Sequence, residues 1–312
     1  MSKCPGMSSK EAGKSSACTG CPNQSTCSTK VEDPSIEIIK HKFANHKKIA
    51  IMSGKGGVGK STVSKTFSQF LSKKHSVCLI DLDITGPSTP ILVNSNSLGI
   101  INQISDQFYS FVPLFDFKET FLENDFELAN VLIFDTPPNV TQSHLDIVKY
   151  LNLDGVIIVT QPHFLSFNDC KRMIDFCKKA KFRILGVIVN MDGFVCECGT
   201  INDSIEDGKY FCEQNNVKYL GSIKLKKEIA MKCDKGNDLE IEEYENIYKE
   251  INEIDVYKVC GNDCLVRIVR EDGKSKRICF ITCYDKKEGE RILKLSFKHL
   301  GENVIVVYAN NK

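Results

Sequence analysis

The sequence predicts an α/β fold in which a mostly parallel sheet is covered by helices on both faces. Short runs of Val, Ile, Leu and other apolar residues alternate with helical patterns along the chain. These runs are nearly continuous, which is typical of parallel strands that are buried on both faces. The predicted strands are residues 48–53, 77–81, 131–135, 156–160 and 184–189, with a further short strand near 217–223.

Helical patterns fill the intervals between these strands. The first helix is expected to follow the strand at 48–53 and to run through about residue 74, and residues 239–253 are predicted to form a closing helix. Beyond about residue 255 the pattern becomes that of a small α+β unit. A hairpin is predicted there, followed by a helix and a last strand, at Cys264–Arg270, Arg277–Tyr284, Lys286–His299 and Val304–Tyr308.

The first part of the chain has a different composition. Residues 1–34 are rich in Ser, Lys, Gly and Thr and hold few large apolar side chains. Such a segment buries too little surface to offset its ordering entropy, so we expect it to be flexible. We therefore divide the chain into a cysteine-rich extension (1–34), a main domain (35–254) and a small C-terminal extension of unknown role (255–312).

Charge and hydropathy exclude several classes of protein. The chain has 312 residues, and 41 Lys and Arg against 40 Asp and Glu leave a formal net charge of +1. This balance gives no support for binding nucleic acid, which usually requires a basic excess. The sequence contains no apolar run of about 18 residues, so we expect no membrane span. The N-terminus lacks the apolar segment of a secretory signal, which predicts a cytoplasmic protein.

The cysteines are numerous and unevenly distributed. The chain has 15 of them, and in a reducing compartment clustered thiols are more often metal ligands than disulfides. Five single cysteines lie mostly within apolar patterns and are expected to be small buried hydrophobic residues: Cys78, Cys170, Cys177, Cys212 and Cys233. The others fall in three groups, near the N-terminus, at 196–198 and in the C-terminal extension.

A glycine-rich motif follows the first predicted strand. Residues 53–62 read SGKGGVGKST and fit the pattern G-x-x-x-x-G-K-[ST]. Glycines let successive backbone N–H groups face phosphate oxygens, and the following helix N-terminus favours negative charge. Lys60 is expected to neutralise the β- and γ-phosphates and Ser61 to ligate Mg²⁺. The predicted nucleotide-binding residues of this loop are Gly54, Gly56, Gly57, Val58, Gly59, Lys60, Ser61 and Thr62.

Acidic residues end two other strands. Asp81 and Asp83 close the second strand, and Asp135 closes the strand at 131–135. Ligands of open α/β sheets bind at the carboxyl ends of the strands, so these side chains are expected to face the nucleotide. We assign Asp135 to Mg²⁺, directly or through water, and Asp83 to orienting the attacking water. Capping of the helices that follow is the alternative role.

The second lysine of the loop, Lys55, makes the motif resemble the deviant Walker A class of P-loop NTPases. That class includes the nitrogenase iron protein, septum-site and partition ATPases, and the Mrp/NUBP scaffolds. The resemblance implies a nucleotide-bound dimer in which Lys55 reaches the phosphates of the partner subunit. From the residues alone, the alternative for Lys55 is a solvated loop lysine.

Two further stretches are similar to the Mrp/NUBP family in particular. Residues 81–90, DLDITGPSTP, resemble its D-x-D-x-x-G-P-S-x-P signature, and residues 135–145 resemble its D-T-P-P-G-T-S-D-E-H-L. The resemblance covers about residues 1–255 and places Asn190 against the adenine. Departures occur near the switch regions: Asn139 replaces a glycine, and the chain has no tryptophan and lacks the family's W-R-G-P motif.

The N-terminal cysteines narrow the resemblance. Cys4, Cys18, Cys21 and Cys27 precede the NTPase domain, as in eukaryotic cytosolic iron–sulfur scaffold NTPases that pair with a shorter relative lacking the extension. Four thiolates on a flexible segment are able to hold a [4Fe–4S] cluster. Zinc is the alternative, although zinc sites usually show two close cysteine pairs and only Cys18 and Cys21 are close here.

Cys196 and Cys198 fall where relatives carry C-P-x-C, the pair that holds a labile cluster between two subunits. Two thiolates from each subunit complete a set of four across a two-fold axis. The spacing here is one residue shorter, but in an extended segment residues i and i+2 share a face. In the C-terminal extension, Cys260, Cys264, Cys279 and Cys283 are interpreted as residues of a packed unit, with a second metal site as the alternative.

Taken with the resemblance, these features predict a slow, Mg²⁺-dependent ATPase that assembles [4Fe–4S] clusters and transfers them to cytosolic and nuclear apo-proteins. The expected cofactors are ATP, Mg²⁺ and [4Fe–4S] clusters, and the expected assembly is a homodimer or a heterotetramer with a related NTPase. Two alternatives remain at this point. One is an electron-transfer ATPase of the nitrogenase-iron-protein type, and the other is a positioning ATPase with structural zinc.

Overall fold

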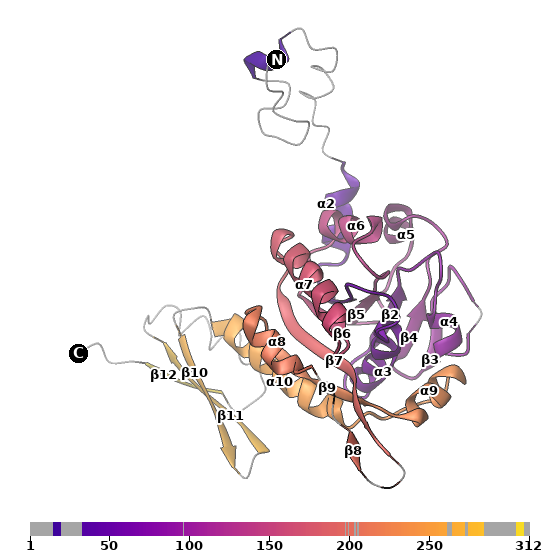
Figure 1. The fold of residues 1–312 in the computed structure, drawn as a ribbon. Coiled ribbons are helices and arrows are strands. Elements are labelled where there is room, and N and C mark those ends of the chain that lie inside the picture. The colour runs from indigo at the N-terminus through magenta and orange to yellow at the C-terminus, as the bar shows by residue number, and fades with distance from the viewer. Residues whose placement is uncertain are drawn as a thin grey trace.

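A computed structural model describes residues 15–19, 33–95, 97–196, 198, 200–202, 204, 206–260, 264–271, 274–283 and 304–308, and side chains beyond 251 are not included. In this part of the chain a nine-stranded sheet has the order β3-β4-β2-β5-β1-β6-β7-β8, with β9 also paired to β7 (Figure 1). All pairs are parallel except β3 with β4 and β7 with β8. The strands are β1 (Lys47–Met52), β2 (Val77–Asp81), β3 (Asn102–Ser105), β4 (Phe108–Phe111), β5 (Val131–Asp135), β6 (Gly155–Thr160), β7 (Ile184–Val195), β8 (Ile201–Asn202) and β9 (Tyr219–Leu225).

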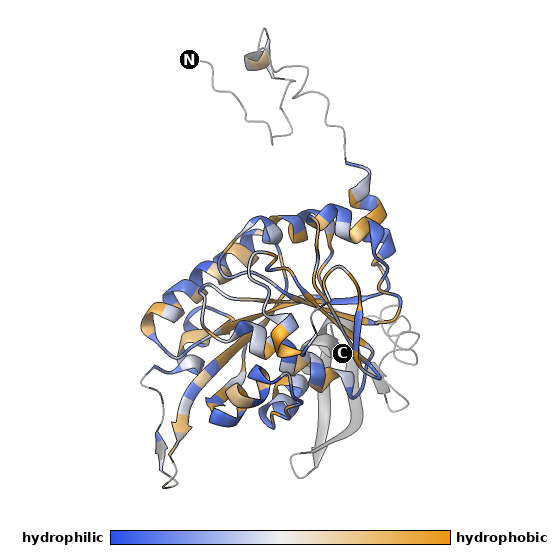
Figure 2. Ribbon diagram, turned by 90° about the vertical axis from the view of Figure 1, so that its right-hand side faces the viewer, coloured by the Kyte–Doolittle hydropathy of each residue, from blue (hydrophilic) through white to orange (hydrophobic). Residues whose placement is uncertain are grey.

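Helices cover both faces of this sheet, as the sequence predicts. The helices packed on one face are α3 (Lys60–Ser72), α4 (Thr89–Leu92), α9 (Lys227–Asp234) and α10 (Glu243–Cys260). Those on the other face are α2 (Ser35–Lys42), α5 (Phe117–Glu123), α6 (Gln142–Tyr150), α7 (Phe164–Lys179) and α8 (Gly208–Gln214). Figure 2 shows the apolar strands between helices whose outer sides are polar. The fold class predicted from the sequence is confirmed.

Burial on both faces explains why polar and apolar residues do not alternate along the central strands. Every residue of β2, β5 and β6 is buried, because each of these strands is covered by one hydrophobic cluster on each face. The five single cysteines are all buried in these two clusters, which confirms their interpretation as small apolar residues. Burial also raises the pKa of the Cys177 thiol to about 12, so this sulfur stays protonated and unreactive.

The ends of the chain are described only in part. A single turn, η1 (Ser16–Cys18), lies in the N-terminal extension, and β10 (Cys264–Glu271), β11 (Lys274–Cys283) and β12 (Val304–Tyr308) form a separate three-stranded sheet. The predicted hairpin and last strand are therefore confirmed, whereas the predicted helix at 286–299 lies outside the described residues. Helix α10 runs across the predicted boundary at residue 254, and the division into domains stays a prediction.

Candidate nucleotide site and cysteine hairpin

The glycine-rich loop lies between β1 and α3 at the carboxyl edge of the sheet. Gly57 and Gly59 have φ angles of 79° and 80°, which side chains other than glycine rarely adopt. A Cβ atom at Gly57 would meet open space, so the loop leaves room beside its backbone. No side chain caps the N-terminus of α3, and its first N–H groups remain available to an anion. The loop therefore fits a bound phosphate chain.

Lys60 and Asp135 meet at the base of this loop. The Lys60 ammonium donates a hydrogen bond to Asp135 Oδ1, and these side chains are only 7% and 1% exposed. The Ser64 hydroxyl donates to the same carboxylate oxygen at 2.9 Å. Lys60 is predicted to contact the phosphates and Asp135 to contact Mg²⁺. In this structure the two side chains instead neutralise each other. The Asp135 carboxylate is a suitable oxygen ligand for Mg²⁺, as is the Ser61 hydroxyl on the first turn of α3.

Asp81 and Asp135 are neighbours across β2 and β5, which aligns the ends of these strands. Asp81 is fully buried and accepts backbone N–H groups of Asp83, Ser88 and Thr89, each at 3.0 Å. Burial, followed by the nearby negative charge of Asp135, raises the pKa of Asp81 to about 6. Asp81 therefore holds the loop after β2, while Asp83 lies two residues further along, where it is partly exposed.

Two amide side chains hold the glycine-rich loop, Gln161 directly after β6 and Asn190 within the neighbouring β7. The Asn190 amide donates to the Val58 carbonyl at 3.0 Å, and the Gln161 amide donates to the Gly57 carbonyl at 3.2 Å. Glycine suits position 59 because its φ angle is 80°, and a Cβ atom there would also displace the Asn190 amide. The predicted contact between Asn190 and adenine stays a prediction, since the structure shows this amide engaged with the loop.

Lys55 differs from Lys60 in its surroundings. It lies in the glycine-rich loop with a partly exposed side chain, and its backbone carbonyl accepts the Ser53 hydroxyl at 3.0 Å. Within the part of the chain that the structure describes, its ammonium group has no hydrogen bond or ion pair. An unpaired lysine beside a phosphate-binding loop is available to a ligand or to a second subunit.

Cys196 and Cys198 follow β7 at the tip of a hairpin. β7 pairs with the short β8, and the Cys196 N–H donates to the Thr200 carbonyl at 3.0 Å. Figure 1 shows this hairpin projecting from the lower edge of the sheet. The two sulfur atoms are joined as a disulfide, with their Cα atoms 5.3 Å apart. The shortened C-x-C spacing therefore brings both sulfurs to one point, where reduction would present two thiols together.

Of the four N-terminal cysteines, the structure describes one. Cys4, Cys21 and Cys27 lie outside the described residues, and Cys18 ends η1 with its sulfur 3.6 Å from the Ser15 hydroxyl. Among the residues that the structure describes, no three His, Cys, Asp or Glu side chains gather in a metal-binding group. Within the same residues, no helix combines the length and the apolar character needed to cross a membrane.

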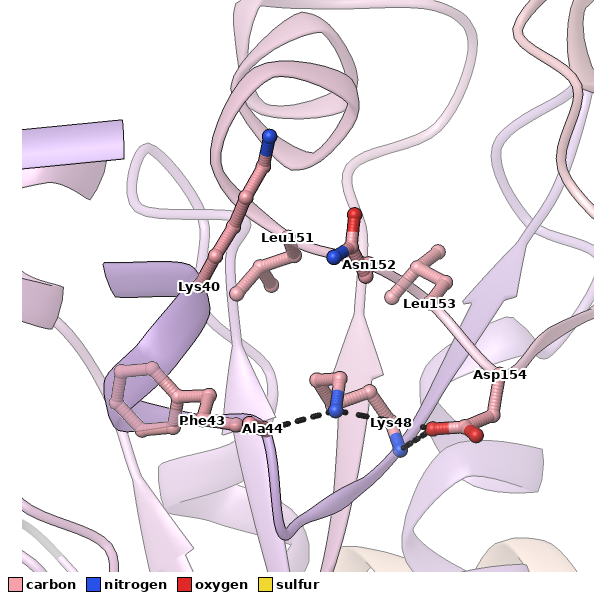
Figure 3. Close-up of a pocket in the computed structure, with 8 residues that line it drawn as sticks. All are labelled: Lys40, Phe43, Ala44, Lys48, Leu151, Asn152, Leu153 and Asp154. Carbon is pink, nitrogen blue, oxygen red and sulfur yellow. Dashed lines mark hydrogen bonds and ion pairs between the residues drawn. The ribbon is translucent and has the colours of Figure 1, made fainter. Parts of the chain in front are cut away.

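A pocket of about 330 Å³ lies at the opposite edge of the sheet (Figure 3). Its lining includes Lys48, at the start of β1, and Asp154, just before β6. The buried Lys48 ammonium donates to the carbonyls of Phe43 and His46 and lies 3.8 Å from Asp154. Two carbonyl acceptors and a nearby carboxylate thus hold this ammonium group, so the lysine fixes the start of β1 and we assign the pocket no ligand.

Sequence comparison agrees with this geometry. The fold and the glycine-rich loop define a P-loop protein of the nucleotide-binding class. A family model described as "ParA: NUBPL iron-transfer P-loop NTPase" matches residues 44–116 and 116–257. The chain belongs to this family of P-loop NTPases, whose members hydrolyse nucleoside triphosphates.

Individual relatives were found by sequence and by structure. The chain is 33% identical over 291 residues to the cytosolic Fe-S cluster assembly factor Nubp1 homolog of Drosophila melanogaster. This alignment covers 79% of the chain and 93% of the Drosophila protein. The homolog of Drosophila sechellia matches with the same identity and the same coverage. By structure, the chain resembles an ADP-bound nucleotide-binding protein from Archaeoglobus fulgidus, with a TM-score of 0.54 and 24% identity over 64% of this chain and 90% of that one.

A second structural match concerns the fold alone. The septum site-determining protein MinD from Pyrococcus horikoshii, complexed with Mg-ADP, has a TM-score of 0.53 and 20% identity, covering 67% of this chain and 96% of that one. Together with the Archaeoglobus protein it places the sheet and its helices among the MinD/ParA-like P-loop folds.

Proposed function

We propose that the protein is an ATP-hydrolysing scaffold that assembles [4Fe–4S] clusters on Cys196 and Cys198 and passes them to apo-proteins in the cytoplasm and nucleus. The observation that carries this proposal is that one strand, β7, serves both sites. Asn190, within β7, binds the glycine-rich loop, and Cys196 follows six residues later. Between them Met191 and Gly193 have positive φ angles, where the pairing of β7 with β9 shifts its register. We expect a change at the loop to reach the cysteine hairpin through this short segment of β7. The name of the Drosophila relatives, cytosolic Fe-S cluster assembly factor, supports the same activity.

The nucleotide chemistry follows from the charges at the loop. We expect Lys60 to bind the β- and γ-phosphates after it leaves Asp135, with Ser61 and Asp135 holding Mg²⁺. The metal would neutralise charge on the phosphates during hydrolysis. Lys55 would stabilise the charge that develops on the phosphates of the partner subunit, and Asp83 would orient the attacking water. The exchange of Lys60 between Asp135 and phosphate supplies a switch that responds to nucleotide.

Dimer formation is supported by apolar side chains around the loop. The segments that follow four strands at this edge each expose large apolar residues: Ile84 after β2, Leu114 and Phe115 after β4, Val140 after β5, and Phe164 and Leu165 after β6. Their exposed fractions range from 43% to 68%. Exposed apolar residues gathered around a functional site are typical of an interaction surface. A second copy, or a related NTPase lacking the extension in a heterotetramer, would cover them and align Lys55 with the opposite nucleotide.

The N-terminal extension is assigned a separate role in this proposal. We infer that Cys4, Cys18, Cys21 and Cys27 hold a second [4Fe–4S] cluster, which is more stable because one chain supplies all four thiolates. The hairpin pair supplies only two thiolates from each subunit, so its cluster is held by two chains and is the one expected to be transferred.

The test is cluster transfer from the anaerobically loaded protein to an apo iron–sulfur enzyme whose activity returns with its cluster. We expect transfer by the wild type and loss of transfer in the Cys196→Ala/Cys198→Ala variant. The control is Cys212→Ala, which removes a buried thiol of α8 outside the hairpin. Transfer that persists in the double variant would refute the proposal.

A further inference from the structure

The first turn of α6 is attached to both loops of the nucleotide site. The Ser143 hydroxyl donates to the Leu82 carbonyl at 3.3 Å, in the loop after β2, and the His144 imidazole accepts the Thr141 backbone N–H at 3.2 Å. The loop between Asp135 and α6 is itself fixed to the glycine-rich loop, because the Asn139 N–H donates to the Ser53 carbonyl at 3.1 Å. Displacement of these loops therefore displaces the start of α6.

The last turn of α6 holds a single carboxylate that precedes α2. Asp33 lies 3.4 Å from the Lys149 ammonium and accepts the Tyr150 hydroxyl at 3.2 Å. A third contact comes from Lys118 of α5, at 3.2 Å. Asp33 also accepts the backbone N–H of Ser35 at 3.1 Å and the Ser35 hydroxyl at 2.5 Å, so the same carboxylate is bonded to the first residue of α2. These contacts fix the point at which the N-terminal extension joins the NTPase domain.

Helix α6 is short and well anchored between these two ends. Its nine residues span about 13 Å, and Ile147 and Tyr150 are buried against the sheet side. The Tyr150 ring stacks on Phe117 of α5 at 5.8 Å. A helix of this length moves as a rigid body rather than by bending, so movement at its first turn reaches its last turn.

We infer that α6 transmits the nucleotide state of the glycine-rich loop to α2, and hence to the cysteine-rich extension, through the contact of Lys149 and Tyr150 with Asp33. Cys27 is only six residues before Asp33, at most about 20 Å of extended chain. The inference rests on the proposed function for its purpose, since it links nucleotide turnover at the glycine-rich loop to the cysteine-rich extension that precedes α2.

The test is amide hydrogen exchange of α2 in the full-length protein, with and without a non-hydrolysable ATP analogue and Mg²⁺. In the wild type we expect nucleotide to slow exchange of α2 by about five-fold or more. The Lys149→Met/Tyr150→Phe variant removes the α6 contacts with Asp33 and keeps the hydrogen bonds between Asp33 and Ser35 of α2. It is expected to bind the analogue normally and to lose this response.

A matched control removes the third partner of Asp33. Lys118→Met takes away a contact of similar length that comes from α5 rather than α6, and the response of α2 should persist. A response that survives in the double variant, disappears equally in Lys118→Met, or is absent from the wild type would overturn the inference. The assay uses no iron or sulfide, so its outcome is independent of whether clusters bind at Cys196 and Cys198.

Discussion

The Lys60 ammonium is hydrogen-bonded to the Asp135 carboxylate, and both groups are almost completely buried. This pairing compensates two charges that would otherwise be costly to bury at the end of β1 and β5. It also means that Lys60 has to leave Asp135 before it reaches a phosphate. Asp135 then needs another cation, and Mg²⁺ carried with the nucleotide provides it.

Replacing Asp135 by Asn should therefore change how Mg²⁺ affects binding. We expect Asp135→Asn to lower Mg²⁺-dependent hydrolysis by about 10²-fold or more. Without Mg²⁺ the variant should bind nucleotide more tightly than the wild type, because Lys60 no longer leaves a charged partner. Calorimetric titration of ADP with and without Mg²⁺ measures this, with Asp175→Asn on the exposed side of α7 as the control. An unchanged effect of Mg²⁺ on affinity would show that Asp135 does not contact the metal.

The role of Lys55 can be tested by mixing two inactive variants. Lys55→Ala and Lys60→Ala are each expected to be inactive as pure dimers. In a mixed dimer the Lys55→Ala subunit keeps its own Lys60 and receives Lys55 from its partner. With random mixing half of the dimers are mixed, and each has one intact site of two, so hydrolysis should return to about a quarter of the wild-type rate. Absence of any recovery would mean that Lys55 acts within its own subunit or not at all.

Two glycines of the loop should differ sharply in their tolerance of alanine. A Cβ atom at Gly54 would overlap the backbone carbonyl of Asp169 in α7, whereas at Gly56 the nearest atoms are carbons of Pro138 at 3.9 Å. We expect Gly54→Ala to destabilise the protein by about 1–3 kcal/mol or more, and Gly56→Ala to have little effect. Urea unfolding compares them, and equal midpoints would contradict the close packing of the loop on α7.

His144 should make stability depend on pH. It is fully buried, and burial followed by the charge of Lys60 lowers its pKa from 6.5 to about 4. The unfolded chain takes up a proton below about pH 6.5 and the native state only below about 4. The contribution of His144 is therefore complete above pH 6.5 and is lost as the pH falls towards 4, up to about 3 kcal/mol.

The variant His144→Gln isolates this contribution, because glutamine at this helix position also accepts the Thr141 N–H and does not titrate. Between pH 7 and 4.5 its unfolding free energy should fall less than that of the wild type. Urea unfolding at the two pH values provides the measurement, and parallel losses in both proteins would mean that His144 is protonated in the native state.

The sequence predicted best the parts of the site that a few consecutive residues determine. The glycine-rich loop, its flanking strand and helix, and the carboxylate that ends β5 were all predicted, because each depends on a few consecutive residues. Ser64 and Gln161 were missed as partners of the site, although Gln161 directly follows β6 at the edge where ligands bind.

Other features depend on contacts between distant segments. The extension of β7 beyond Val189 to Val195 arises from its pairing with β8 and β9, which local propensity does not determine. The pairing of Lys60 with Asp135 joins residues 75 positions apart in the chain. The sequence indicated that each contacts the nucleotide, but only the fold shows that each also neutralises the other.

The central claim is that clusters are assembled on the cysteine hairpin, and its most direct test is iron, acid-labile sulfide and zinc analysis of the anaerobically reconstituted protein. The Cys18→Ala/Cys21→Ala and Cys196→Ala/Cys198→Ala variants would be measured alongside. The account predicts near-stoichiometric iron and sulfide in the wild type, with a separate part lost in each double variant. Zinc without sulfide, or a cluster content that is unchanged when Cys196 and Cys198 are removed, would contradict it.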